Sequence, residues 1–546
     1  MSTLQTHAPV NAPSRAKRSA LFSRLAKDFM GLDRHDPVVT LDGSLATKRR
    51  VYLDTTATAL MPRLIADSLN EYYAHACANS HTEAHRAGRD TTAAIEYSRD
   101  AIGRLLGYDP QRDVVLFTAN GATGASNFLS RALFPPELRA IVKRFPKGVP
   151  PEFRRMLRDS LGTAMQTALD ALEARPLIVT TIMEHHSNLL PWLEAVGKHN
   201  VRVVGVNGAD GTLDMDEFER IMASEGNRVR LVAVTGVSNV TGIVNPVRRM
   251  AKVAHQCGAQ ILVDAAQWIP HAKVELHQAD ASSDIDFVTL SGHKLYAPGS
   301  RGALIGNMAT FECNRCISDV GGGMVEYVAI DDYDVKKQVT AREEAGTPNI
   351  PGTIAMGLIA EMLDRVGMDV VAEAEEELTG KLMERLLRID GVKVYGATDI
   401  ARVHRAGVVS FNVLGYEHGL VAAYLNDVHN IAVRDGCFCA HPYVKQLMRF
   451  GCEEEKCFRA QMVQGDRRNI PGMVRASLGV YSTADDVAVL GEALDTFKKD
   501  ADRIASRYSV HMDGTYRLKE TPPLPCTFDV KNRVSEWEQG SERFSH

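Results

Sequence analysis

The 546-residue sequence lacks several features that mark particular classes of protein. No uninterrupted apolar run approaches the ~20 residues that a membrane-spanning helix needs, so we expect no membrane span. The net charge is only -5, from 63 basic and 68 acidic residues, which gives no electrostatic argument for binding nucleic acid or an anionic membrane. Nine cysteines in so long a chain do not make a disulfide framework. These absences predict a protein of a reducing compartment, the cytoplasm, whose thiols are individually structural or reactive.

The chain is long enough for more than one domain. A single hydrophobic core stops growing near ~250–300 residues, so at least two domains are expected. Short apolar runs alternate with helical patterns from residue 51 to residue 306, which is typical of an α/β domain with a doubly wound, mainly parallel sheet. The predicted divisions are an N-terminal arm at 1–49, a large domain at 50–353, a smaller α/β domain at 354–505 and a tail at 506–546.

Three segments depart from this pattern. Residues 1–27 contain basic but no acidic side chains and no apolar stretch of the secretory kind, so we expect a loosely docked or disordered arm, with an organelle transit peptide as the alternative. Residues 134–175 are rich in Arg, Lys and Pro before a helical pattern begins. They predict an inserted surface subdomain, with docking of a partner as the alternative. Residues 506–546 contain several prolines and predict an irregular surface tail.

The most informative stretch runs from Ile261 to Gly302. Two short apolar runs within it end on polar residues, the first on Asp264 and the second just before Lys294. Runs of this kind are typical of buried parallel strands, and functional groups gather at the carboxyl ends of such strands. A lysine there can hold an aldehyde cofactor as a Schiff base, while an acid can keep a pyridine nitrogen protonated. The alternative is a plain surface ion pair.

The neighbours of this pair carry a resemblance to a known family. The pattern D-x-x-Q followed by S-x-H-K resembles the pyridoxal phosphate (PLP) site of the class V aminotransferase superfamily, over roughly residues 50–490. The resemblance implies the type I PLP-dependent aminotransferase fold, a homodimer, and a catalytic Lys294 that holds PLP. It also implies that Asp264 faces the ring nitrogen and Gln267 the phenolic oxygen. Ser291 and His293 are donors suited to the phosphate.

Three further turns follow expected strands. Small residues after the strand at 113–118 open a helix, where backbone N–H groups and the helix dipole attract a phosphate, and the resemblance makes Ala122 and Thr123 contacts there. It places His185 on the face of the PLP ring as a catalytic residue, although a lone histidine is more often structural. It places Asn239 at the phenolic oxygen or the substrate carboxylate.

A second informative stretch, residues 431–442, reads IAVRDGCFCAHP. It resembles the catalytic-cysteine loop R-x-G-x-x-C-A-x-P of group II cysteine desulfurases and selenocysteine lyases. By register the catalytic thiol is Cys439, while Cys437 and Phe438 replace a pair that is commonly polar, which leaves the substrate open. A Cys-x-Cys pair also permits a resolving thiol or an oxidised pair. The alternative is two unreactive loop cysteines.

The resemblance assigns the remaining site residues. Arg475, on a strand near the mouth of the site, suits bidentate capture of an amino acid's α-carboxylate, and Arg434 and His81 are further candidates for substrate binding. For His81 the alternative is a solvated loop histidine. Thr347, in an A-G-T-P loop, is expected to reach the PLP phosphate of the partner subunit. Two cysteine pairs remain, but only the first has a spacing common among zinc ligands, so we expect no metal. The four cysteines are Cys313, Cys316, Cys452 and Cys457.

Together these motifs predict a PLP-dependent cysteine desulfurase-like enzyme. It would remove sulfur from L-cysteine or a related amino acid through a persulfide on Cys439, release alanine, and pass the sulfur to an acceptor protein or a small thiol. One alternative is an aminotransferase, epimerase or C–S lyase of the same superfamily that does not use the cysteine. The other is a non-catalytic sulfur carrier or metal-binding scaffold.

Overall fold

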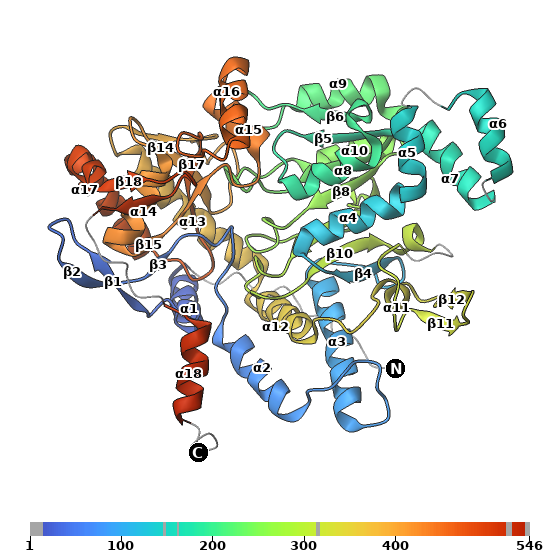
Figure 1. Ribbon diagram of the computed structural model, residues 1–546, viewed down its shortest axis with the longest axis horizontal. Coiled ribbons are helices and arrows are strands. Elements are labelled where there is room, and N and C mark those ends of the chain that lie inside the picture. The colour runs from blue at the N-terminus through green and yellow to red at the C-terminus, as the bar shows by residue number, and fades with distance from the viewer. Residues whose placement is uncertain (1–14, 146–148, 161–162, 313–316, 520–526, 541–546) are drawn as a thin grey trace.

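A computed structural model describes residues 15–145, 149–160, 163–312, 317–519 and 527–540, and within them two sheets organise the chain (Figure 1). The larger sheet has seven strands in the order β4-β10-β9-β8-β7-β5-β6. Neighbouring strands run parallel except at β10, which is antiparallel to both of its neighbours. The strands are β4 (Asp113–Thr118), β5 (Leu177–Thr181), β6 (Val201–Val204), β7 (Val229–Thr235), β8 (Gln260–Asp264), β9 (Phe287–Ser291) and β10 (Gly302–Asn307).

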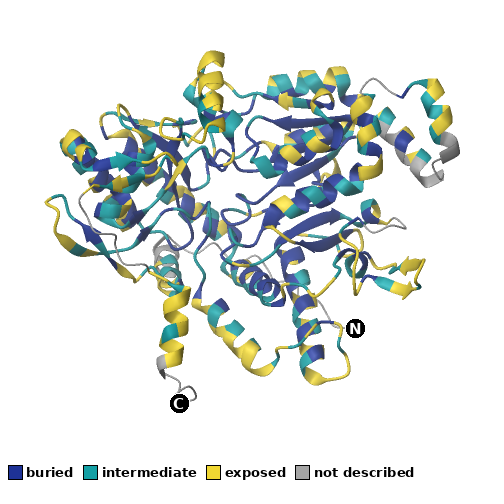
Figure 2. Cartoon of the chain, viewed as in Figure 1, coloured by how far each residue is buried: buried dark blue, intermediate teal, exposed yellow. Residues whose placement is uncertain are grey.

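The larger sheet is buried on both faces, as the dark strands of Figure 2 show. One face carries a core cluster that includes Phe128 and Trp192, and the other a cluster that includes Met250 and Ile359. The strand interiors are rich in Val, Ile and Leu because they must bury side chains on both sides. The helices around this sheet are α2 (Arg63–His75), α3 (Arg86–Leu105), α4 (Gly121–Leu133), α8 (Leu190–Val196), α9 (Met215–Glu225), α10 (Val247–Gln256), α11 (Val339–Glu343) and α12 (Ile350–Val366).

The smaller sheet has four antiparallel strands in the order β13-β14-β17-β16 and a core cluster of its own. Its strands are β13 (Val392–Val394), β14 (Val408–Val413), β16 (Arg434–Gly436) and β17 (Met473–Ser477), and its helices are α13 (Met368–Leu387), α14 (His418–His429) and α17 (Ala484–Ser506). Two more helices, α15 (His441–Met448) and α16 (Cys452–Val463), follow β16. The predicted α/β class, with a large mainly parallel sheet, is confirmed.

The N-terminal entry of the chain reaches across to this second sheet. Strand β3 (Val51–Tyr52) pairs in parallel with β15 (Ile431–Ala432), and Asp54 forms a bridge with Ser477. The backbone N–H of Thr56 donates to the hydroxyl of Ser477 over 3.0 Å. Segments that are 421 positions apart in the sequence are thereby joined beside the carboxyl ends of the strands of the larger sheet.

The terminal segments contain more regular structure than the sequence indicates. Within the expected arm, α1 (Arg15–Asp28) is helical and its Phe22 packs against the large core, and β1 (His35–Val39) pairs with β2 (Leu45–Arg49). Within the expected irregular tail, the structure forms β18 (Tyr508–Val510), β19 (Tyr516–Leu518) and α18 (Val530–Gly540). The insertion forms α5 (Pro136–Arg144), α6 (Pro151–Ser160) and α7 (Thr163–Ala174), and a hairpin pairs β11 (Val325–Val328) with β12 (Tyr333–Val335).

In the ranges that the structure describes, no helix is both long enough and apolar enough to cross a membrane.

Candidate active site

A cavity of about 260 Å³ lies at the carboxyl ends of the central strands, with the smaller sheet supplying its other wall. Eleven of the fourteen predicted site residues line it: Ala122, Thr123, His185, Asn239, Asp264, Ser291, His293, Lys294, Arg434, Cys439 and Arg475. It is also lined by Thr56, Ala57, Asn120, Ser187, Ala266 and Phe438. Residues from both sheets therefore meet around a single space.

The floor of the cavity holds the acid and the lysine. Parallel strands β8 and β9 place Asp264 opposite Thr289, so that Asp264 and Lys294 leave the sheet at the same edge. Burial raises the pKa of Asp264, while the backbone N–H of Ala266 and the charge of Lys294 oppose that shift. Burial lowers the pKa of Lys294. A lowered amine pKa favours the neutral form, which is the form that attacks an aldehyde.

One end of the cavity is built for an anion. The thirteen-residue helix α4 begins there at Gly121, whose φ is +64°, and the N–H of Ala122 donates to the hydroxyl of Ser291 over 2.9 Å. A Cβ at position 121 would lie 2.7 Å from that hydroxyl oxygen, so only glycine allows this approach. Thr123 shares a hydrogen bond of 2.6 Å with Ser187. The helix dipole and these donors suit a phosphate group.

Two histidines on this side of the cavity are neutral at physiological pH. Burial, reinforced by Lys294, lowers the pKa of His185 to about 3 and that of His293 to about 4. The Nδ1 of His185 accepts the backbone N–H of Ser187 over 3.1 Å, which assigns the ring proton to Nε2. A neutral imidazole held in this way can lie against an aromatic cofactor without adding charge.

The opposite wall carries Arg475, a buried arginine on β17. Its Nη1 donates to the backbone carbonyl of Asn239 over 2.9 Å, and its Nη2 lies 3.4 Å from a carboxylate oxygen of Asp54. Its Nε is buried and makes no hydrogen bond within the described residues. Burial lowers the pKa of Arg475 to about 10, which leaves the guanidinium cationic at neutral pH. An arginine so placed can bind a carboxylate.

The thiol of Cys439 opens onto the same cavity from the loop after β16. Cys439 and the preceding Phe438 both have left-handed backbone, with φ of +54° and +52°. Two long-range hydrogen bonds hold this shape: the Asn239 side-chain amide donates to the Phe438 carbonyl over 2.7 Å, and the backbone N–H of His186 donates to the Cys439 carbonyl over 2.8 Å. The loop is therefore anchored to the larger sheet.

The second cysteine of the loop is placed differently. Cys437 lines a separate hollow of about 520 Å³, and its thiol donates to the carbonyl of Pro471 over 3.2 Å. Burial raises the pKa of Cys437 to about 11, so this thiol stays protonated. Because a thiolate is the nucleophilic form, the arrangement favours Cys439 over Cys437 as the reactive residue.

Three predicted residues lie outside the cavity. Gln267 is buried next to it, and its side-chain amide donates to the Thr56 carbonyl over 2.8 Å. His81 and Thr347 are exposed. Asp54, the partner of Arg475, was not among the predicted site residues. Residues 50–54 read RVYLD, an apolar run that ends on an acid, so the kind of strand-end signal that marks Asp264 could also have found Asp54.

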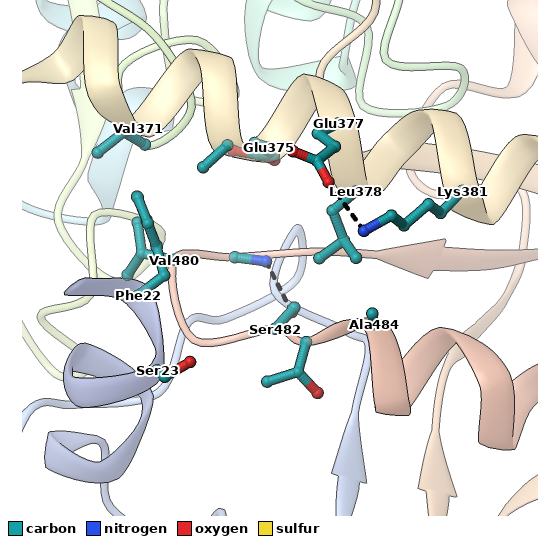
Figure 3. A pocket seen from close by; sticks show the side chains of 13 residues that line it. Phe22, Ser23, Val371, Glu375, Glu377, Leu378, Lys381, Val480, Ser482 and Ala484 are labelled. Carbon is teal, nitrogen blue, oxygen red and sulfur yellow. Dashed lines mark hydrogen bonds and ion pairs between the residues drawn. The ribbon is translucent and has the colours of Figure 1, made fainter. Parts of the chain in front are cut away.

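Another cavity, of about 220 Å³, lies between α1, α13 and the segment before α17 (Figure 3). There Lys381 pairs with Glu377 at 2.9 Å, and the Gly479 N–H donates to Ser482 over 3.0 Å. No cysteine lines it.

Among the described residues no group of three or more His, Cys, Asp or Glu is placed to hold a metal. Two of the cysteines considered as zinc ligands, Cys452 and Cys457, lie exposed on α16. The other two, Cys313 and Cys316, fall outside the described ranges.

The fold and site can now be compared with known proteins. The family model for class-V aminotransferases matches residues 51–144 and 158–490, and the chain belongs to this family. It is 31% identical over 438 residues to a cysteine desulfurase of Cronobacter sakazakii, covering 80% of this chain and 90% of the relative. It is 29% identical over 460 residues to a probable cysteine desulfurase of Halalkalibacterium halodurans, covering 84% and 96%.

Solved structures agree with this assignment. An apo cysteine desulfurase from Thermococcus onnurineus superimposes with a TM-score of 0.64 at 29% identity, over 82% of this chain and 95% of that one. The cysteine desulfurase CsdA of Escherichia coli, in an S-sulfonic acid form, superimposes with a TM-score of 0.62 at 25% identity over the same shares. The resemblance read from the motifs and the type I PLP-dependent fold are both confirmed.

Pyridoxal phosphate is the cofactor of this family, and the residues of the cavity fit it. The buried hydroxyl of Thr56 and the Nε of Arg475 have no hydrogen-bonding partner among the described residues, so the site offers polar atoms that await a ligand. The Lys294 amine and the Asp264 carboxylate suit the aldehyde and the ring nitrogen, and the start of α4 suits the phosphate. When bound, PLP supplies an electron-withdrawing ring that stabilises negative charge at a substrate Cα.

Proposed function

We propose that the protein is a PLP-dependent cysteine desulfurase that takes the sulfur of L-cysteine, or of a closely related amino acid, onto Cys439 and releases alanine. One observation carries the proposal: the thiol of Cys439, the amine of Lys294 and the guanidinium of Arg475 all open onto the same cavity. An aminotransferase needs the last two groups but has no use for a thiol at that place. The names of the similar proteins support the same activity.

In this activity each residue has a separate task. Arg475 binds the substrate carboxylate and so orients the amino acid above Asp264 and Lys294. The Lys294 amine, whose pKa is lowered by burial, takes a proton from the substrate Cα. The Cys439 thiolate then attacks the substrate sulfur: an S–S bond forms, the Cβ–S bond breaks, and its electron pair stays on Cβ, which takes up a proton. Lys294 returns a proton to Cα, which gives alanine.

The sulfur is then carried as a persulfide. A thiolate of an acceptor protein or of a small thiol attacks the outer sulfur of the Cys439 persulfide, which forms a new persulfide and returns Cys439 as a thiolate. Because Cys439 is exposed, such an acceptor can approach it. We further propose a homodimer in which the exposed Thr347 reaches the partner's phosphate site, and a location in the cytoplasm, where the free thiols of the described chain stay reduced.

The test is to incubate the PLP-loaded protein with L-cysteine and a panel of other amino acids, measuring sulfide, alanine and keto acid together. The proposal expects alanine and sulfur in equal amounts from L-cysteine, and neither from a Cys439→Ala variant. Turnover that survives in Cys439→Ala would favour an aminotransferase, epimerase or C–S lyase. A protein that never gains visible cofactor absorbance would favour a non-catalytic sulfur carrier or scaffold.

A further inference from the structure

The residue before the cysteine, Phe438, joins the two walls of the cavity. Its ring lies over the guanidinium of Arg475, with the Cζ atom 4.6 Å from the ring centroid. Its carbonyl accepts the side-chain amide of Asn239 over 2.7 Å, and the backbone carbonyl of Asn239 in turn accepts Nη1 of Arg475 over 2.9 Å. Each of Phe438, Asn239 and Arg475 therefore contacts the other two. Phe438 is also the residue directly before Cys439.

The backbone at Phe438 is held in an unusual shape by these contacts. A φ of +52° is rare for a bulky aromatic residue, and Cys439 follows in the same left-handed region at +54°. Such a conformation persists only where the surroundings determine it strongly. Phe438 is only 8% exposed, so its ring packs within the cavity wall and not on the protein surface.

The ring also restricts how a ligand can reach Arg475. The guanidinium carbon lies over the face of the ring, while Nη1 donates to Asn239 and Nη2 lies near Asp54. The buried Nε has no partner in the described chain, and Nη1 and Nη2 each carry a second N–H beyond the bonds named above. A carboxylate binds a guanidinium in its plane, at an edge that carries N–H donors, so contact with an aromatic face that restrains this plane also restrains the direction of approach.

We propose that Phe438 is a positioning residue: it fixes the plane of Arg475 for the substrate carboxylate and couples occupancy of Arg475 to the placement of the Cys439 thiol. The identity of the carboxylate as that of the amino-acid substrate rests on the proposed function. The physical coupling between Arg475 and the cysteine loop stands on the contacts alone.

The test uses three variants of the full-length protein. Phe438→Leu keeps an apolar side chain but removes the aromatic face, Phe438→Tyr keeps that face, and Phe450→Leu is a matched control, because Phe450 pairs with Phe458 outside the cavity. Binding of L-alanine, measured by the change in cofactor absorbance, is expected to weaken about tenfold in Phe438→Leu and to stay within about twofold of wild type in the other two.

A second readout needs no cofactor. The rate at which iodoacetamide alkylates Cys439, followed on its peptide by mass spectrometry, is expected to rise several-fold in cofactor-free Phe438→Leu and to be unchanged in Phe438→Tyr and Phe450→Leu. When the proteins are loaded with PLP, adding L-alanine should change the alkylation rate of Cys439 in wild type and in Phe438→Tyr. In Phe438→Leu, L-alanine should leave the alkylation rate unchanged. Wild-type behaviour of Phe438→Leu in both measurements, or equal damage in Phe438→Tyr, would overturn the proposal. A wild type that binds L-alanine but gives no alanine from L-cysteine would instead overturn the proposed function.

Discussion

The two walls of the cavity are built in different ways. The wall that carries Lys294 and Asp264 consists of residues at the ends of adjacent parallel strands, where regular backbone places each side chain. The wall that carries Cys439 is a loop of consecutive left-handed residues, held by hydrogen bonds from His186 and Asn239 on the far side of the cavity. The residues of the first wall lie on strands that are neighbours in the sequence, whereas the second wall takes its shape only after segments far apart in the sequence have packed together.

The two walls should therefore differ in how well their shape withstands amino-acid substitutions. A buried strand end tolerates changes elsewhere, because its position is determined by the ladder of the sheet and by packing on both faces. A strained loop keeps its shape only as long as each anchoring contact is present. We therefore expect substitutions in the first wall to remove the cofactor chemistry outright, and substitutions in the second wall to leave the cofactor bound while changing the fate of the sulfur.

The largest effect is expected for Lys294→Ala. Under the proposed function the variant lacks the amine that would hold the cofactor and move the Cα proton, so desulfurase activity should fall by at least about 10⁴-fold and the visible absorbance of the loaded protein should disappear. Lys381→Ala is the matched control, because Lys381 is a paired lysine in the other cavity. Normal absorbance in Lys294→Ala would contradict the assignment of the first wall.

Cys439→Ser should affect the second wall alone. The hydroxyl is too weak a nucleophile to take the sulfur, so alanine formation from L-cysteine should fall by at least about 10³-fold while cofactor absorbance is retained. Cys437→Ser should keep most of the activity, since the pKa of Cys437 is raised by burial to about 11 and its thiol faces another hollow. If Cys437→Ser is the inactive variant of the two, the roles of the two cysteines must be exchanged.

A smaller effect is expected for Arg475→Lys. A lysine keeps the charge but loses the planar donor edge, and the loss of a charge-assisted hydrogen bond is worth about 1.5–3 kcal/mol, or about 10- to 150-fold in kcat/KM for L-cysteine. Most of the change should be a rise in KM. Steady-state kinetics on wild type and Arg388→Lys, an exposed arginine outside the cavity, provide the comparison. An unchanged KM in Arg475→Lys would remove Arg475 as the carboxylate anchor.

The smallest effect concerns stability and pH. The pKa of His185 is lowered to about 3 in the folded protein, below its ordinary value near 6.5, so the folded state binds fewer protons than the unfolded state between those values. Stability therefore falls as pH drops from 6.5 toward 3. In cofactor-free His185→Asn this loss should be smaller by about 1.4 kcal/mol at pH 5.5, as measured by urea unfolding at pH 7.5 and pH 5.5. A loss of equal size in both proteins would show that His185 does not carry this pH dependence.

The sequence predicts the first wall well for a physical reason. Strand ends are recognisable as apolar runs that stop at polar residues, and parallel strands bring their ends to one edge, so Asp264 and Lys294 can be placed together without a structure. The second wall was predicted by family resemblance, which gave the register of Cys439. It could not give the left-handed backbone of Phe438, the stacking of its ring on Arg475, or the pairing of Arg475 with Asp54. The hydrogen bond from Asn239 to Phe438 spans 199 positions and that from Arg475 to Asp54 spans 421, and the stacking depends on the loop shape that the first of these holds.

The terminal segments show the same limit. The amphipathic pattern of α1 is weak and its composition is basic, so residues 15–28 read as a loose arm, although Phe22 finds a place against the large core. The hairpin of β18 and β19 is short, and its three-residue strands leave little periodicity to detect. In both cases regular structure depends on tertiary packing and not on local propensity.

The joining of residues 51–56 to strands near the C-terminal end has a consequence for synthesis. While the chain emerges from a ribosome, the strands that place Lys294 can assemble well before Cys439 and Arg475 have been made. A nascent chain halted at residue 430 would then display the amine and its acid partner without the thiol or the guanidinium. Under the proposed function, the groups that would hold the cofactor are thus made and placed before the groups that would receive the sulfur.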